Sequence, residues 1–155
     1  MAAPARQPVR LVLDTKVVVA GLLWNGPPRR LVEMAIGGLV FSPYSSPVLI
    51  DELARTLAYP KFASRIVSFG TSIDGLVAQY AALVSLVSLV SPSATPRIVF
   101  ADADDDHVIA AAVAAQAQLI VTGDRKHLLP IGSHQGIAII AVREALDRFE
   151  TSIGS

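Results

Sequence analysis

Residues 119–124 read Leu-Ile-Val-Thr-Gly-Asp, and residues 11–14, near the other end of the chain, read Leu-Val-Leu-Asp. Each segment is a short apolar run that stops at or just before an aspartate, a pattern typical of a strand buried on both faces of a parallel sheet. In an open α/β sheet, ligands bind outside the carboxyl ends of the strands. We therefore expect Asp14 and Asp124 to lie at the same edge of one sheet.

Helical and strand patterns alternate along the rest of the chain. The predicted helices cover residues 15–23, 28–36, 47–57, 62–84 with a break near residue 70, 104–116 and 142–149. The further predicted strands cover residues 39–42, the second half of residues 83–91, and residues 137–141. This alternation favours an α/β fold with one parallel sheet covered on both faces. We expect a single domain over residues 1–155, with residues 1–9 and 151–155 as flexible tails.

The composition limits the possible partners. Thirteen basic and thirteen acidic residues give a formal net charge of zero, so a nucleic-acid enzyme would have to carry its binding charge locally. The chain has no cysteine, which excludes a disulfide framework and thiolate metal sites and fits a cytoplasmic location. The apolar part of the uncharged stretch 75–96 falls short of the roughly 20 residues of a membrane span, so we expect none.

Four acidic residues stand at the ends or edges of the apolar segments. They are Asp14, Glu52, Asp106 and Asp124. Asp14 and Asp124 follow predicted strands, whereas Glu52 and Asp106 belong to amphipathic helical patterns. Converging carboxylates repel one another unless a cation is bound among them. The pattern therefore predicts a site for a divalent metal ion.

Each of these acids also has a plain structural explanation. Asp14 can be the N-cap of the helix that follows it, and Glu52 can be an ordinary residue on a helix surface. Residues 102–106 contain four aspartates, which can form an acidic first helical turn favoured by the helix dipole. The histidines show no zinc-ligand spacing and are expected on the surface or in loops.

Four segments, in this order, resemble the PIN-domain family. They are residues 11–15 (Leu-Val-Leu-Asp-Thr), 46–53 (Ser-Pro-Val-Leu-Ile-Asp-Glu-Leu), 106–112 (Asp-His-Val-Ile-Ala-Ala-Ala) and 120–124 (Ile-Val-Thr-Gly-Asp). Residues 24–30 and 59–62 are similar to the branch of bacterial PIN proteins assigned as toxins of toxin–antitoxin pairs. Each motif is weak singly, but together they are specific, and the resemblance covers residues 10 to about 142.

The resemblance implies a three-layer α/β/α sandwich with a central parallel sheet and a Mg²⁺- or Mn²⁺-dependent ribonuclease. The cation would activate water for in-line attack on phosphorus and offset charge on the departing oxygen. The catalytic, metal-binding residues would be Asp14, Glu52, Asp106 and Asp124. The supporting residues would be Thr15, Lys16, Asp105 and Thr122, and the residues that contact the RNA backbone would be Arg125 and Lys126.

The resemblance also implies partners. These are an RNA substrate, a cognate antitoxin protein that covers the acidic cleft, and a second copy of the chain in a homodimer. The apolar stretch 76–90 is a candidate for the face between the copies, and burial in the core is the alternative explanation for it.

Lys16 departs from the family pattern, which has asparagine two places after the first aspartate. Its ammonium group can pair with Asp14 or Asp124 and compete with the metal, since the attraction at ~4 Å is roughly 4 kcal/mol at an effective dielectric of 20. Either Lys16 swings outward and the enzyme is active, which is our leading prediction, or the chain is a weakened or non-catalytic binding module. A haloacid-dehalogenase-like phosphatase with Asp14 as nucleophile is a third reading, but Lys16 stands where its general acid would be.

Overall fold

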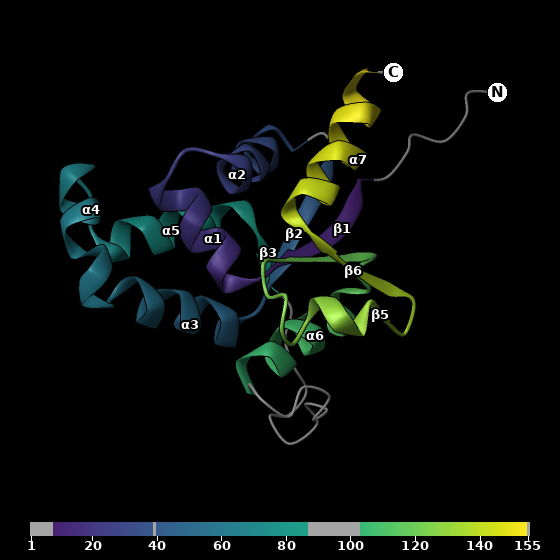
Figure 1. The fold of residues 1–155 in the computed structure, drawn as a ribbon. Coiled ribbons are helices and arrows are strands. Elements are labelled where there is room, and N and C mark those ends of the chain that lie inside the picture. The colour runs from purple at the N-terminus through teal and green to yellow at the C-terminus, as the bar shows by residue number, and fades with distance from the viewer. Residues whose placement is uncertain (1–7, 39, 87–102, 155) are drawn as a thin grey trace.

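The computed structural model describes the backbone of residues 8–38, 40–86 and 103–154, and the side chains of residues 8–38, 40–86 and 107–151. These residues form a six-stranded sheet with helices on both faces (Figure 1). The strands are β1 (Val9–Leu13), β2 (Phe41–Ser45), β3 (Ser85–Leu86), β4 (Leu119–Thr122), β5 (Ser133–His134) and β6 (Ile137–Ala141). The α-helices are α1 (Thr15–Leu23), α2 (Pro27–Gly37), α3 (Pro47–Leu57), α4 (Ala63–Ser68), α5 (Ile73–Leu83), α6 (Ala103–Ala115) and α7 (Val142–Gly154).

The strand order defines where a ligand would bind. Across the sheet the order is β3-β2-β1-β4-β6-β5. All neighbouring strands are parallel except β5 and β6, which are antiparallel. The chain steps outward from β1 to β2 and β3 on one side, and from β4 to β6 on the other. The order therefore reverses between β1 and β4, and the carboxyl ends at such a reversal form the usual crevice for a ligand in an open α/β sheet.

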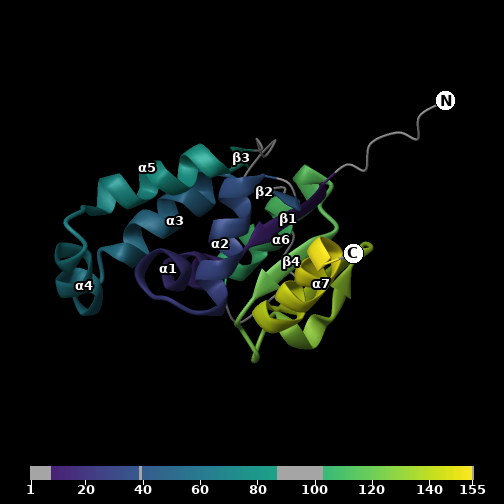
Figure 2. The ribbon, with the colours of Figure 1, turned by 90° about the horizontal axis from the view of Figure 1, so that it is seen from above.

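The two faces of the sheet have separate apolar cores. Leu11 and Leu13 of β1 belong to a core shared with α1, α2, α5 and α7, whereas Val12 belongs to a second core shared with α6. This division follows from the period of two in a strand, which sends successive side chains to opposite faces. Helices α3, α4 and α5 extend beyond α1, away from the sheet (Figures 1 and 2). The predicted α/β sandwich with a mostly parallel sheet is confirmed.

Most predicted elements agree with the structure, and the differences have local causes. The helices over residues 15–23 and 47–57 have the predicted bounds, and the break near Gly70 separates α4 from α5. Strand β2 begins at Phe41, later than predicted, because α2 runs to Gly37 and Gly38 is its left-handed C-cap with φ 69°. The closing helix α7 runs on to Gly154, beyond the predicted end.

Two short strands were not anticipated at their observed positions. β3 and β5 have two residues each, too few to show a period. The strand predicted for the second half of residues 83–91 lies outside the described residues. No single described helix is long and apolar enough to cross a membrane; Pro60–Ser68 and Ile73–Leu83 pass that test only as a pair, which is bent by 80°.

Candidate active site

Asp14 lies between the end of β1 and the start of α1, at the reversal of strand order. Its backbone amide donates to the carbonyl oxygen of Val121 at 2.9 Å, which ties it to β4. Its side chain is only 5% exposed. Asp14 occupies the N-cap position of α1, but its carboxylate makes no capping hydrogen bond. Helix capping therefore does not explain why a carboxylate is buried at this point.

Thr122 links the ends of β1 and β4 through one hydroxyl group. Its Oγ1 donates to Oδ2 of Asp14 at 2.8 Å and accepts from the backbone amide of Asp124 at 3.0 Å. Thr122 is completely buried, so water does not compete for these bonds. Both partners of the hydroxyl are held in place, and the position of the Asp14 carboxylate is set by β4 as well as by its own strand.

Burial raises the pKa of Asp14 above its ordinary value. Hydrogen bonds from the Thr122 hydroxyl and the Thr15 amide favour the charged form and lower the pKa again in part. The negative charge of Asp124 raises the pKa, and the charge of Lys16, the smallest of these influences, lowers it. The Asp14 carboxylate is therefore buried, and it lies close enough to Asp124 for that negative charge to raise its pKa. Lys16, whose side chain is exposed, compensates the charge of Asp14 only weakly.

Asp124 is held by the turn that follows β4. Its Oδ1 accepts from the backbone amides of Lys126 and His127, both at 3.0 Å, and its Oδ2 lies 3.3 Å from Nδ1 of His127. The side chain is 14% exposed. Sequence reasoning did not connect His127 with the acids; the spacing of three residues from Asp124 across a turn is the signal that could have done so. Arg125 and Lys126 are exposed on this turn.

Glu52 belongs to α3, which packs against α1. Ser46 starts α3, because its Oγ accepts from the backbone amide of Leu49 at 3.3 Å. Glu52 itself is half-buried. Among the side chains that the structure describes, no three acidic or histidine residues lie close enough together to hold one ion. The convergence of Glu52 with Asp14 therefore stays a prediction.

Asp105 and Asp106 lie in α6, as the sequence predicted, but their side chains are outside the described residues. The following residues, Val108 and Ile109, are buried in the core beneath β1 and β4. Of the predicted supporting residues, Thr15 is buried beside Asp14 and Thr122 bridges the two strands. The proposed ligand role of Asp106 is untested.

A buried aspartate, a bridging threonine and a second aspartate thus lie together at the reversal of strand order in this α/β protein. A family model described as the PIN domain matches residues 10–126. The chain therefore belongs to the PIN-domain family. PIN domains are generally nucleases and typically use divalent metal ions, so nucleic acid is the general class of partner. No curated protein matches the chain.

Proposed function

We propose that the protein is a metal-dependent endoribonuclease that hydrolyses RNA phosphodiester bonds at the carboxyl ends of β1 and β4. The observation that carries the proposal is the Thr122 hydroxyl, which holds the buried Asp14 carboxylate beside the Asp124 turn. Burying a carboxylate near a second one is unfavourable unless something compensates it. A fold that keeps such a pair in a ligand-binding position supports a site that functions with a bound cation.

The donor chemistry fits a hard divalent cation. Mg²⁺ and Mn²⁺ prefer carboxylate oxygens, and Mg²⁺ usually binds through one or two carboxylates while keeping several waters. Asp14 and Asp124 would hold the ion, with Glu52 and Asp106 as the further proposed ligands. When bound, the ion would supply an activated water and offset charge on the phosphate. Lys16 is exposed, which supports the active reading, because an ammonium group in water competes only weakly for Asp14.

The chain's own residues would orient and position the reactants. Thr122 keeps one oxygen of Asp14 occupied and thereby aims the other. Arg125 and Lys126, exposed beside Asp124, would contact the RNA backbone. His127 contacts Asp124 and would limit how far that carboxylate can turn. Together these groups would present one phosphate to the ion in a fixed orientation.

An RNA-cleavage assay tests the proposal. End-labelled RNA is incubated with Mg²⁺ or Mn²⁺ and the wild type, Asp14→Asn, or Asp51→Asn. Asp14→Asn keeps the shape and an acceptor for Thr122 but removes the charge, so cleavage should be lost. Asp51 is an exposed acid on α3, and Asp51→Asn should cleave like the wild type. Equal cleavage by wild type and Asp14→Asn would overturn the proposal.

Two other readings give different results with the same proteins. A non-catalytic binding module would bind no Mn²⁺ in calorimetry unless Lys16→Asn were introduced. A phosphatase would hydrolyse a generic phosphomonoester rapidly and leave RNA intact. Measuring Mn²⁺ binding and phosphomonoester turnover beside RNA cleavage therefore separates the three.

We further propose, on the resemblance to bacterial PIN toxins, that the protein is the toxin of a toxin–antitoxin pair and forms a homodimer. An antitoxin that covers the acidic site would have to block metal access to Asp14. Expression of the wild type should then arrest growth and expression of Asp14→Asn should not. Normal growth with an active, well-expressed wild type would contradict the toxin role.

A further inference from the structure

Helix α1 has one open stripe along its length. Lys16 is exposed, Ala20 is half-buried and Trp24, the C-cap, is exposed, while the other residues from 15 to 23 are buried. These three positions are four residues apart and therefore lie on the same side of the helix. Asp14 directly precedes α1 and Trp24 directly follows it. The nine residues of α1 span about 14 Å at 1.5 Å per residue, so the stripe leads from the candidate active site to Trp24.

Aromatic rings and one arginine gather at the far end of this stripe. Trp24 and Phe69 are 41% and 52% exposed. The guanidinium carbon of Arg65 lies 5.6 Å from the Trp24 ring centre and 4.7 Å from the Phe69 ring centre. Arg65 is fixed there because its Nε donates to the carbonyl oxygen of Leu23 at 2.8 Å. Trp24 also packs edge-on against Phe62, with ring centres 5.7 Å apart. Arg65 and Phe62 therefore cover part of the ring surface, while Trp24 and Phe69 both remain exposed to solvent.

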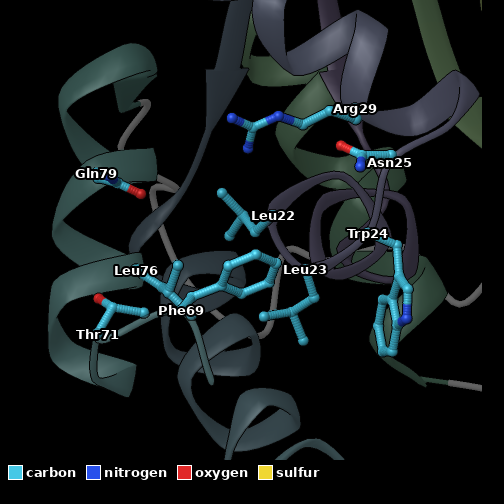
Figure 3. Close-up of a pocket in the computed structure, with 9 residues that line it drawn as sticks. All are labelled: Leu22, Leu23, Trp24, Asn25, Arg29, Phe69, Thr71, Leu76 and Gln79. Carbon is cyan, nitrogen blue, oxygen red and sulfur yellow. The ribbon is translucent and has the colours of Figure 1, made fainter. Parts of the chain in front are cut away.

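A pocket of about 230 Å³ lies beside these rings (Figure 3). Its lining residues come from α1, α2, α5 and the loops at their ends, and they are Leu22, Leu23, Trp24, Asn25, Arg29, Phe69, Thr71, Leu76 and Gln79. The pocket is smaller than the roughly 300–1,000 Å³ that drug-sized ligands occupy, which suits a single flat ring system. Asn25, Thr71 and Gln79 also line the pocket, so the polar edge of any base held there would have hydrogen-bonding groups near it.

The two segments that build this surface are positively charged. Residues 15–32 and 53–73 contain no acidic residue, and their cations are Lys16, Arg29, Arg30, Arg55, Lys61 and Arg65. Arg29 and Arg30 pair with Glu33 and Glu150. Within the described part of the chain, however, neither Lys61 nor Arg65 forms an ion pair, and Lys61 lies 5.1 Å from the ring centre of Phe62. Lys61 and Arg65 therefore provide uncompensated positive charge beside the exposed rings.

We propose that Trp24, Arg65, Phe69 and the adjoining pocket form a stacking site for unpaired bases of single-stranded RNA. The inference rests on the proposed ribonuclease function and locates a binding subsite for its substrate at the opposite end of α1 from Asp14. Exposed aromatic faces combined with arginine and an uncompensated positive surface are the usual means of binding single strands without sequence preference. The backbone of the bound strand would follow the stripe past Lys16 to the Asp14 site. Duplex RNA is excluded from stacking because its bases are already paired and stacked.

Trp24 makes a direct test possible, because it is the sole tryptophan of the chain. Its fluorescence is measured in EDTA, so that no cleavage occurs, while a 12-nucleotide single-stranded RNA or the same RNA annealed to its complement is added. We expect the single strand to quench the fluorescence and the duplex to leave it nearly unchanged. Binding of the single strand, seen by anisotropy of a labelled RNA, without any change in Trp24 fluorescence would overturn the proposal.

Variants separate stacking from simple apolar contact. Trp24→Leu and Phe69→Leu keep apolar bulk but remove the aromatic face, and each should weaken binding of the single strand at least about fivefold. Trp24→Phe keeps a face and should bind within about twofold of the wild type. Val67→Ala, at a position 74% exposed on α4, is the matched surface control and should bind normally. Circular dichroism and thermal melting confirm that each variant is folded.

Cleavage in Mg²⁺ or Mn²⁺ distinguishes this inference from the nuclease proposal. Trp24→Leu should raise KM for the 12-nucleotide RNA while kcat on a dinucleotide, too short to reach Trp24, stays the same. If the wild type cleaves nothing, but the single strand quenches Trp24 fluorescence and the leucine variants bind it more weakly, the nuclease proposal fails and the stacking site stands. If the wild type cleaves, but the leucine variants bind RNA as tightly as it does, the stacking site is wrong. If the leucine variants bind RNA normally but no longer bind a co-expressed antitoxin, the stacking site is also wrong, and the surface binds a protein partner instead.

Discussion

Replacing Thr122 by valine tests whether one hydroxyl organises the junction of β1 and β4. Valine has nearly the same shape, so the change removes two hydrogen bonds and little volume. The bond to the Asp14 carboxylate, at 2.8 Å, involves a charged acceptor and contributes about 1.5–3 kcal/mol, and the bond from the Asp124 amide contributes about 0.5–1.5 kcal/mol. The additional buried methyl group returns about 0.8 kcal/mol. We therefore expect Thr122→Val to lower the free energy of unfolding by about 2 kcal/mol.

The assay is urea denaturation at pH 8 in EDTA, with Thr122→Ser as the control. Serine keeps both hydrogen bonds and loses a buried methyl group, which costs about 1 kcal/mol. The cost of the valine variant should exceed that of the serine variant. In an Asp14→Asn background the acceptor is neutral, so the cost of Thr122→Val should fall by about 1 kcal/mol. Equal stability of the valine and serine variants, or an unchanged cost in the Asp14→Asn background, would refute the reasoning.

Two further predictions concern the same region. Because burial raises the pKa of Asp14 above its ordinary value of 3.8, the folded protein binds this proton more tightly than the unfolded chain and loses stability as pH rises above 3.8. In EDTA, Asp14→Asn should therefore have the same urea midpoint as the wild type below pH 3.8 and a higher midpoint at pH 7. A difference between the two urea midpoints that does not change with pH would contradict this. Gly21→Ala would place a methyl group 2.7 Å from Val32 Cγ2 and 2.9 Å from the Pro28 carbonyl oxygen, so it should cost about 1–3 kcal/mol. Gly37→Ala, with nothing within 4 Å, is the control in thermal melting and should be nearly neutral.

Local patterns in the sequence were sufficient for the long elements. The start of α3 could be predicted because Ser46 and Pro47 act within one turn, and the structure contains that cap. β1 and β4 could be predicted because both of their faces are buried, which requires uninterrupted apolar residues. Elements of two residues, such as β3 and β5, carry no periodic signal and depend on the strand beside them.

The candidate active site, too, could be predicted only in part from the sequence. The sequence indicated that Asp14 and Asp124 follow strands at the same edge of one sheet, and the resemblance named Thr122 as a supporting residue. Only the structure showed that these two strands are neighbours. The contact between His127 and Asp124 depends on how the turn after β4 closes, which residue types alone did not show. The unpaired charge of Arg65 could be located beside Trp24 only after folding, because its Nε donates to the carbonyl oxygen of Leu23 and ties α4 to the end of α1.

The amino-acid sequence by itself determined which segments are helices, which are buried strands, and that acids follow the strands, because each of these properties depends on neighbours within a few residues. Only the tertiary structure decided that one buried hydroxyl joins β1 to β4 and that Trp24, Arg65 and Phe69 meet at the end of α1. Those contacts join residues many positions apart. They form when the apolar faces of separate elements pack together, a condition that no local pattern contains.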